Sequence, residues 1–570
     1  MPFLPMTRSE MDALGWQQAD IILISGDAYV DHPSFGIAII GRSLEAAGYK
    51  VAILAQPDPN KNSDFLALGK PRLCFGISAG NMDSMVNHYT AQRKIRTDDA
   101  YTPGGLSGKR PDRATIIYTN KIKQLFKGVP VIIGGIEASL RRIAHYDYWS
   151  DTVKNSVLAD SKADILVYGM AEQTMVRIAD HLNAGNSIKE LKDLPGTVVF
   201  DNPDPQISDQ FILPKASDCK DKQTYHQAYR SFYDNFQHQT LFQENGGRFL
   251  RHNPPAPPLS EPELDRIYAL EFENAPHPSY KLQTIPAWEQ IKDSLTSHRG
   301  CYGGCNFCAI TAHQGREIQS RSADSIVQEA TRLTRKHRSN LPGATYRFHG
   351  TISDVGGPTA NMWQSKCKLD YPESCKRRSC IFPNICPNLQ FDHQKQLEML
   401  DRVSSVEGVN HVFISSGIRH DMAIKDSKYI AALAKRYTGG RLKLAPEHAS
   451  DRILRLMGKP SISVYEKFCA EFQEQCGKAG LKRQVIPYLI IGHPGTTLEE
   501  AKQLANWLRQ NKITVEQVQE FTPTPMTIST CMYYTGLDFE TGKPIHIPKG
   551  REIREQKELL FWWKGSRIHN

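Results

Sequence analysis

Short apolar runs alternate with amphipathic helical patterns along most of this chain of 570 residues. Near the start, apolar runs at 19–25 and 50–54 flank a helical pattern at 34–48 that ends in a glycine. Parallel strands need a crossover connection, which is usually a helix, so the alternation predicts an open parallel sheet of the doubly wound α/β class. Ligands of such sheets bind beyond the carboxyl ends of the strands.

The alternation resumes in the second half of the chain. Helical patterns at 322–338 and 463–480 enclose apolar runs at 344–350 and 410–417, and the run at 484–495 enters a glycine turn. The period of about 35–45 residues is typical of a full or partial β/α barrel. We therefore expect two α/β units joined in one chain.

Five prolines between residues 253 and 262 separate the two series and predict an extended linker. The length of the chain allows several domains. The expected parts are an N-terminal α/β domain at 1–195, an irregular region with the proline-rich linker at 196–285, a β/α barrel at 286–530 with a cysteine-rich insertion at 358–391, and a basic, aromatic C-terminal segment at 531–570.

Composition narrows the class of protein. A hydrophobic content of 40% excludes a largely disordered chain. The sequence has no run of about 18 apolar residues, so we predict no membrane-spanning segment. The start of the sequence lacks a secretory pattern, so we expect a cytoplasmic protein. A net charge of +9 over this length does not indicate a nucleic-acid partner. In a reducing compartment, the twelve cysteines suggest metal ligands rather than disulfides.

Three of those cysteines stand close together in HRGCYGGCNFCAI, residues 298–310. Cys301, Cys305 and Cys308 have the spacing C-x3-C-x2-C. Thiolates on one short loop can ligate three irons of a 4Fe–4S cube and leave the fourth iron open to an exchangeable ligand. A structural zinc loop is the alternative, with His298 or His313 as fourth ligand, because zinc normally takes four ligands.

With Phe307 before the last cysteine, this loop resembles the motif of the radical S-adenosylmethionine (SAM) superfamily. The resemblance implies that the open iron chelates SAM through its amino and carboxylate groups. One electron from the reduced cluster then cleaves SAM to methionine and a 5′-deoxyadenosyl radical, while the protein positions and shields the cofactor. It also implies an electron donor such as flavodoxin or ferredoxin.

The same resemblance implies further contacts to SAM at the ends of the barrel strands, although plain packing and turn chemistry are the alternative for each. Two glycines match the motif that holds the methionine amino group, but Pro358 stands where that motif has glutamate. The predicted cofactor-binding residues are Phe307, Gly356, Gly357, Ser415, Ser416, Arg419, Glu447, Gly492, Pro494 and Gly495.

Longer stretches are similar to the YgiQ-type radical SAM proteins. They include SAGNMDSMVNHYTA at 78–91, DAYTPGG at 99–105 and GGIEASLRRIAHYDYWS at 134–150, and the similarity runs from about residue 15 to 563. GMAE at 169–172 departs from the usual GMGE. The resemblance implies a chemistry but no reaction, because the substrate of that family is unassigned.

A second cysteine group falls in the predicted insertion. Cys367, Cys375, Cys380 and Cys386 could ligate a second iron–sulfur cluster or a zinc ion, or could be reduced thiols or a redox pair. Their gaps of seven, four and five residues match no compact motif. Basic residues between them would favour thiolates by lowering their pKa.

The N-terminal sheet is similar to the cobalamin-binding domains joined to some radical SAM barrels. Their histidine-ligand motif is Asp-x-His-x-x-Gly, whereas this chain has Asp31, His32 and Gly36 at another spacing. We therefore interpret His32 as a residue at a helix start and expect no cobalamin. Polar residues at 83–147 predict either a substrate surface or an interdomain salt-bridge network.

Three classes of function remain open from the sequence. The first is a radical SAM enzyme that acts on an unknown substrate. The second is an RNA-modifying enzyme of the methylthiotransferase type, and the third is a non-enzymatic iron–sulfur redox or sensor protein. The lack of a clear RNA-binding module disfavours the second.

Overall fold

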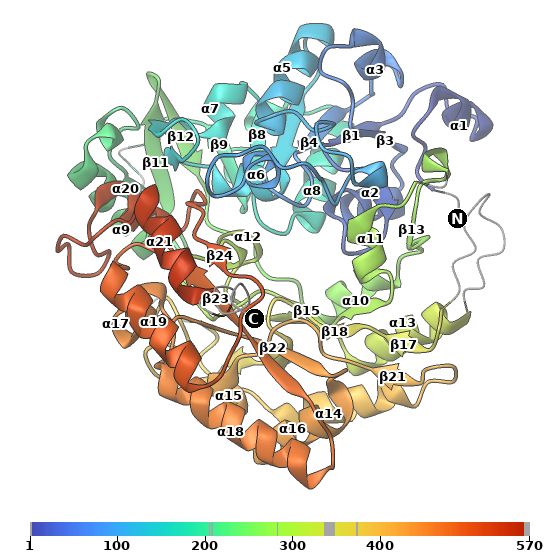
Figure 1. Cartoon of the computed structure of the whole chain (residues 1–570). Coiled ribbons are helices and arrows are strands. Elements are labelled where there is room, and N and C mark those ends of the chain that lie inside the picture. The colour runs from blue at the N-terminus through green and yellow to red at the C-terminus, as the bar shows by residue number, and fades with distance from the viewer. Residues whose placement is uncertain are drawn as a thin grey trace.

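The computed structural model describes residues 3–561 and 563, apart from 205, 207–208, 282, 336–347 and 372–373. Two α/β halves face each other (Figure 1). The N-terminal half, in blue to green, is built on one large sheet, and the C-terminal half, in yellow to red, alternates parallel strands with helices. Within the described part of the chain, no helix is long and apolar enough to cross a membrane.

Five parallel strands form the centre of the N-terminal sheet. In sheet order they are β3 (Val51–Ala55), β1 (Ile21–Ser25), β4 (Cys74–Ser78), β5 (Val131–Gly134) and β8 (Ile165–Val167). Their apolar runs are buried on both faces, as expected for parallel strands covered by helices. The chain visits these strands in the doubly wound order 2-1-3-4-5, whose direction reverses between β1 and β4.

Helices cover both faces of this sheet. Helices α2 (Gly36–Ala46) and α8 (Glu172–Asn183) pack on one face, and α5 (Ala114–Leu125) packs with α7 (Val157–Ser161) on the other. Neighbouring residues of β1 point to opposite faces and join two separate hydrophobic cores. The predicted doubly wound sheet is therefore present.

The region expected to be irregular at 196–285 instead extends the sheet. Its strands β9 (Thr197–Phe200), β10 (Gln210–Ile212), β11 (Thr240–Asn245) and β12 (Arg248–His252) add a mixed edge beyond β8. The prediction was wrong here because we overlooked the Gly246–Gly247 turn. Both glycines have positive φ, which is the geometry of a tight hairpin between alternating strands. The prolines that follow form no helix or strand before α10 (Glu261–Ala269).

Parallel strands of the C-terminal half follow one another in the order of a partial β/α barrel. Among the described residues, β14 pairs with β18, β17 with β21, and β22 with β23 and β24, but β21 and β22 form no ladder. The predicted strand at 344–350 lies partly outside the described residues. The strands are β14 (Ser294–Thr296), β17 (Thr351–Ile352), β18 (Asp354–Gly356), β21 (His411–Val412), β22 (Arg441–Glu447), β23 (Gln484–Ile491) and β24 (Gln519–Glu520).

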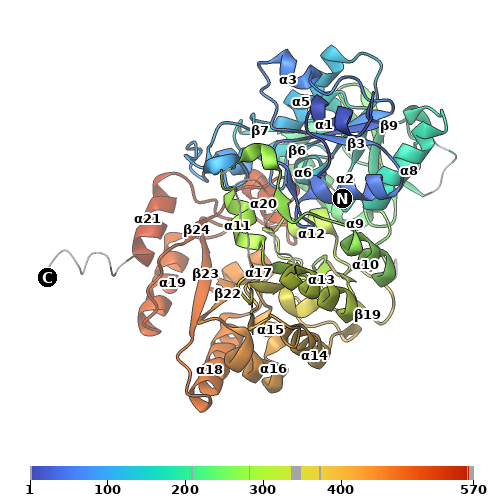
Figure 2. The ribbon, with the colours of Figure 1, turned by 90° about the vertical axis from the view of Figure 1, so that its right-hand side faces the viewer.

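Helices complete this half and connect it to the N-terminal sheet. Helices α11 (Pro286–Ile291), α12 (Ile310–Gln314) and α20 (Ile528–Thr535) lie between the halves (Figure 2). Tyr534 of α20 stacks on Tyr146 of the N-terminal half, with ring centroids 4.7 Å apart. The outer helices are α13 (Ala323–Arg335), α14 (His393–Ser404), α16 (Ser427–Ala432), α18 (Ile462–Lys478), α19 (Leu498–Gln510) and α21 (Arg551–Leu560).

Candidate functional site

The three cysteines of the 301–308 loop lie together between the two halves. The Gly303 N–H donates to Cys301 Sγ at 3.4 Å, and Arg419 Nη1 donates to Cys305 Sγ at 3.5 Å. Burial raises the pKa of the Cys308 thiol to about 12, and the charges of Cys305 and Cys301 add to this rise, so all three thiols are neighbours. That they share one metal site stays a prediction.

Glycines shape the cysteine loop. Gly300 has φ +85°, and a Cβ there would meet the carbonyl of Glu317. Gly304 has φ +61° and sits against Ser379 of the insertion. Both positions therefore require glycine for backbone conformation and for space. The loop leads directly into α12, which faces the N-terminal sheet.

The thiols fit an iron–sulfur cube better than a single ion. A cube spreads three thiolates over three corners, whereas zinc draws four ligands around one centre. His298 is a poor zinc ligand, because its nitrogens contact Ser297 Oγ at 2.9 Å and the Thr359 carbonyl at 3.0 Å.

The predicted glycine motif lies at the end of β18. A Cβ on Gly357 would meet the carbonyl and ring of His298, and a Cβ on Gly356 would meet Ser416 Oγ. Ser416 donates from its N–H and its hydroxyl to Asp354 Oδ1, at 3.0 and 3.1 Å. Asp354, which sequence reasoning missed, therefore belongs to this site, and burial raises the pKa of its carboxyl.

Arg419 and Glu447 lie near the thiols of the cysteine loop. Arg419 forms two hydrogen bonds with Asp421, at 2.9 and 2.6 Å, besides its contact with Cys305. Burial raises the pKa of Glu447, while Lys459, 3.4 Å away, opposes that rise. Glu447 also adds to the raised pKa of Cys308, which places it near that thiol.

The turn at 492–495 approaches the loop through Phe307. The Phe307 ring meets the His493 ring edge-to-face at 6.4 Å. The Gly492 N–H donates to Gln556 at 2.9 Å, and the Gly495 N–H donates to the His546 carbonyl at 2.7 Å. The C-terminal segment thus holds this turn in place.

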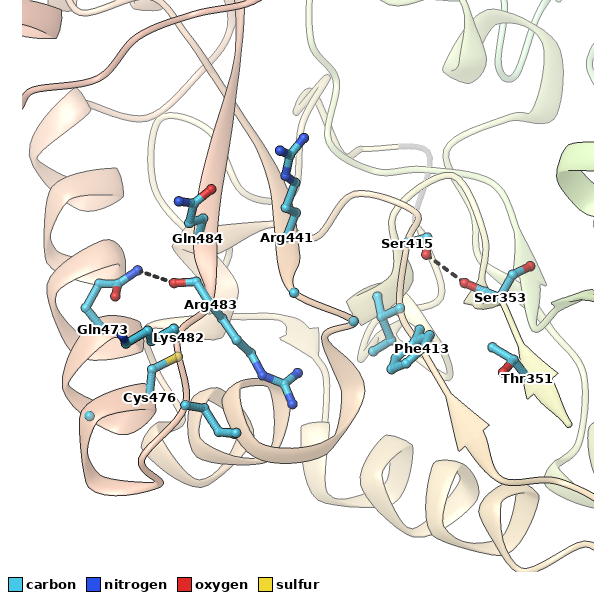
Figure 3. A pocket seen from close by; sticks show the side chains of 15 residues that line it. Thr351, Ser353, Phe413, Ser415, Arg441, Gln473, Cys476, Lys482, Arg483 and Gln484 are labelled. Carbon is cyan, nitrogen blue, oxygen red and sulfur yellow. Dashed lines mark hydrogen bonds between the residues drawn. The ribbon is translucent and has the colours of Figure 1, made fainter.

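Ser415 faces a different cavity, the basal recess, which opens between β21 and β22 (Figure 3). The recess has a volume of about 870 Å³ and contains Arg441, Lys482 and Arg483 but none of the loop cysteines. The Ser415 hydroxyl donates to the Ser353 carbonyl at 2.6 Å. Ser415 therefore lies apart from the cysteine loop, unlike Ser416.

A cavity of about 550 Å³, the interdomain pocket, lies between the two halves and is lined by residues of both. On the sheet side it is lined by the carboxyl ends of β1, β4, β5 and β8, at the point where the strand order reverses. The opposite side is formed by the start of the cysteine loop, the end of β18 and α12. Representative lining residues are Ser25, Asp27, Ser78, Gly80, Gly135, Arg299, His313, Asp354 and Gly356.

Buried charges around this pocket are balanced. Asp27 pairs with Arg110 at 2.6 Å, yet burial still raises the pKa of Asp27 to about 6. Arg299 Nη1 contacts Glu172 at 2.5 Å and so links the two halves. Burial and the charge of Arg142 lower the pKa of His313 to about 4, which makes this imidazole neutral at pH 7.

The polar residues predicted at 83–147 form a salt-bridge network inside the N-terminal half. Arg141 pairs with Asp83 at 2.8 Å, and Arg113 pairs with Asp147 at 2.6 Å. Arg142 differs, because its Nε donates to His252 Nε2 at 2.9 Å. The network alternative accounts for these contacts, and Arg142 also joins the two halves, because its Nη1 donates to the Ala312 carbonyl of α12 at 3.1 Å.

The cysteine-rich insertion packs directly against the cysteine loop. The Cys380 N–H donates to the Tyr302 carbonyl at 3.1 Å, and Ser379 Oγ donates to the Gly303 carbonyl at 2.8 Å. Arg316, which sequence reasoning also missed, donates to Cys375 Sγ at 3.6 Å. No local pattern marks Arg316, because it lies far from Cys375 in the sequence.

Comparisons with known proteins agree on the family of this chain. Residues 3–294 match the family model described as Radical SAM N-terminal, and residues 516–557 match a domain of unknown function, DUF3362. A UPF0313 protein of Methanocella arvoryzae is 48% identical, covering 98% of this chain and 93% of the relative. The UPF0313 protein YgiQ of Escherichia coli K12 is 43% identical, covering 98% and 84%.

The fold is similar to that of a solved radical SAM methyltransferase, TsrM from Kitasatospora setae, with cobalamin and a 4Fe–4S cluster bound. The TM-score is 0.51 at 13% sequence identity, and the match covers 90% of this chain and 74% of TsrM. A second TsrM structure, with tryptophan substrate and a SAM analogue, also gives 0.51.

Our expectation of no cobalamin was wrong as an inference from the fold, because TsrM, which has a similar fold, has cobalamin bound. The expectation was based on the spacing around His32. In the structure His32 is buried near the start of α2, where its Nδ1 accepts from the Ser34 N–H at 3.0 Å, and it does not line the interdomain pocket. The pocket is built from strand ends and glycines, so one histidine motif is a poor indicator for such a domain.

Proposed function

This chain belongs to the UPF0313 family of YgiQ-type radical SAM proteins, and from that premise we propose that it is a radical SAM enzyme that also uses a corrinoid. Cys301, Cys305 and Cys308 would hold a 4Fe–4S cluster, which when reduced supplies the electron that cleaves SAM to methionine and a 5′-deoxyadenosyl radical. The observation that carries the proposal is the meeting of three thiols on one loop beside a pocket at the switch point of the sheet.

The residues around the thiols have definable tasks. Arg419 donates to Cys305 Sγ and is fixed by Asp421, so it would stabilise negative charge on that sulfur. Asp354 lines the pocket, and its Oδ2 accepts no hydrogen bond within the described residues. We assign it the ammonium-binding task that Pro358 cannot perform, because a carboxylate accepts strong hydrogen bonds from a cation.

The sheet side of the pocket would receive the corrinoid. Gly80 and Gly135 have positive φ, and a Cβ on either would meet Asp27 or Ser78. Because these glycines carry no side chain, a ligand can approach the backbone closely at the strand ends. The fold likeness to TsrM supports this assignment.

The decisive experiment is anaerobic. The reconstituted protein is reduced with dithionite, SAM is added, and 5′-deoxyadenosine is measured on samples with known iron, sulfide and cobalt content. We expect deoxyadenosine from the native chain and at least a hundredfold less from Cys301→Ala, because the cube loses one of three ligands. Cys469→Ala, on the outer helix α18, is the matched control and should retain the activity.

Two outcomes would contradict the proposal. Native rates in Cys301→Ala would remove the loop from the chemistry. A reducible cluster whose spectrum is unchanged by SAM would favour the redox or sensor alternative. Cobalt binding is read separately, from the absorbance of the protein after incubation with hydroxocobalamin and gel filtration.

A further inference from the structure

Three cysteines of the insertion are held together by the backbone. Cys367 lies opposite Leu389 in the β19–β20 pair (Lys366–Cys367 with Leu389–Gln390), and the Leu389 N–H donates to the Cys386 carbonyl at 3.0 Å. The Cys386 N–H in turn donates to the Cys380 carbonyl at 2.7 Å. Residues that are 19 positions apart in the sequence are thus connected through two backbone hydrogen bonds and one strand pair.

The fourth cysteine of the insertion, Cys375, is drawn to the same place by Arg316. Arg316 donates to Cys375 Sγ at 3.6 Å and to the Arg377 carbonyl at 2.7 Å. The Arg316 guanidinium also lies over the Tyr371 ring, 5.1 Å from its centroid, and Tyr371 packs against the same buried group as Cys380 and Cys386.

Cys380 packs in one buried group with Cys386 and Leu389, and Leu389 is the residue that pairs with Cys367. All twelve cysteines of the chain are free, so no disulfide accounts for the group. Four reduced thiols on one short insertion are a ligand set that metal centres use.

From this geometry we propose that Cys367, Cys375, Cys380 and Cys386 bind a second iron–sulfur cluster, a 4Fe–4S cube with one thiolate on each iron. A single zinc ion is the alternative, and it would draw all four thiolates around one centre. The four corners of a cube accept thiolates that are farther apart. The proposal goes beyond the radical SAM activity and does not depend on it.

The surroundings of this site suit a cluster. Tyr302, Met362, Ile381 and Leu389 form a buried apolar group around Cys380, and apolar shells limit water access to iron–sulfur centres. The Cys380 N–H bond to the Tyr302 carbonyl places the site directly behind the cysteine loop. Because all four irons would carry protein thiolates, this cluster would have no position for SAM.

The test counts iron, sulfide and zinc in two variants after anaerobic reconstitution. The loop variant is C301A/C305A/C308A, and the insertion variant is C375A/C380A. We expect about eight irons in the native chain and about four in each variant, since each cube holds four. The reduced cluster of the loop variant should give an electron paramagnetic resonance signal that SAM does not change, whereas SAM should change the signal of the insertion variant.

Cys469→Ala is the matched control and should retain about eight irons. About four irons in the native chain and none in the loop variant would overturn the proposal, and so would stoichiometric zinc in place of the second set of irons. If the insertion variant does not fold, as judged by thermal unfolding, the iron content of the loop variant alone decides. Eight irons without SAM cleavage would contradict only the proposed function.

Discussion

Two cavities lie at opposite ends of the parallel strands in the C-terminal half. The interdomain pocket is at the carboxyl ends, where β18 finishes at Gly356, and the basal recess is at the amino ends, where β22 starts at Arg441 and β23 at Gln484. The recess is larger, about 870 against 550 Å³, yet only the pocket adjoins the cysteine loop. In α/β folds position at the strand ends decides function more than volume does.

The two cavities also differ in their electrostatics. Around the pocket, Arg110 and Arg299 each have a buried carboxylate partner, and His313 is neutral at pH 7. The recess exposes Arg441 and Lys482 and has no acidic lining residue. Buried charges that each have an ion-pair partner are typical of a functional site, whereas exposed charges of one sign are typical of a solvated surface.

The largest effect should come from the ion pair that closes the pocket. Glu172→Gln leaves the buried Arg299 guanidinium without its carboxylate, so we expect a loss of about 3–5 kcal/mol in the free energy of unfolding. Urea denaturation of the apoprotein measures it. Glu474→Gln, at an exposed pair on α18 near the recess, should cost less than about 0.5 kcal/mol. Equal costs would contradict the claimed difference between the two cavities.

Acid should lower the free energy of unfolding through His313, which lines the interdomain pocket. Its folded pKa of about 4 lies below the ordinary histidine value of 6.5, so its contribution to stability is complete above pH 6.5 and is lost as the pH falls toward 4. The expected loss is about 2–3 kcal/mol, reduced by the partial exposure of the ring. His313→Gln should flatten this part of the curve of unfolding free energy against pH. An unchanged slope would show that the imidazole is not held neutral.

The sequence predicted features that depend on neighbouring residues better than features that depend on contacts between distant segments. The alternation of apolar runs predicted the parallel strands, and the C-x3-C-x2-C spacing located the three thiols because it spans eight residues. Arg316 beside Cys375 and Asp354 beside Ser416 are contacts between distant segments, so no local pattern marks them. The interdomain pocket likewise exists only once both halves are folded.

A smaller effect, on hydroxocobalamin affinity, should show which of the two cavities binds the corrinoid. Gly36 lines the interdomain pocket at the start of α2 and has ordinary backbone geometry. A Cβ added to Gly36 would have Asn81 Oδ1 as its nearest neighbour, at 3.9 Å. Gly36→Leu should therefore fill the pocket without backbone strain and weaken hydroxocobalamin binding about tenfold, or about 1.4 kcal/mol. Absorbance titration measures the affinity, and iron content should not change.

Gly477 is the matched position in the basal recess. It lies in α18, and an added Cβ would meet nothing within 4 Å. Gly477→Leu should leave hydroxocobalamin binding unchanged. If Gly477→Leu weakened binding and Gly36→Leu did not, the recess rather than the pocket would be the corrinoid site.

The smallest effect concerns the recess itself. Arg483 Nη2 donates to the Lys435 carbonyl at 3.0 Å, but its buried Nη1 has no partner among the residues that the structure describes, and burial lowers the pKa of the guanidinium. A buried unsatisfied donor costs free energy, while methionine keeps most of the apolar stem. Arg483→Met should therefore raise the free energy of unfolding by at most about 1 kcal/mol and leave cofactor binding unchanged. A clear loss of stability, or of SAM or hydroxocobalamin binding, would mean that the guanidinium has a bound anionic partner and that the recess is a second site.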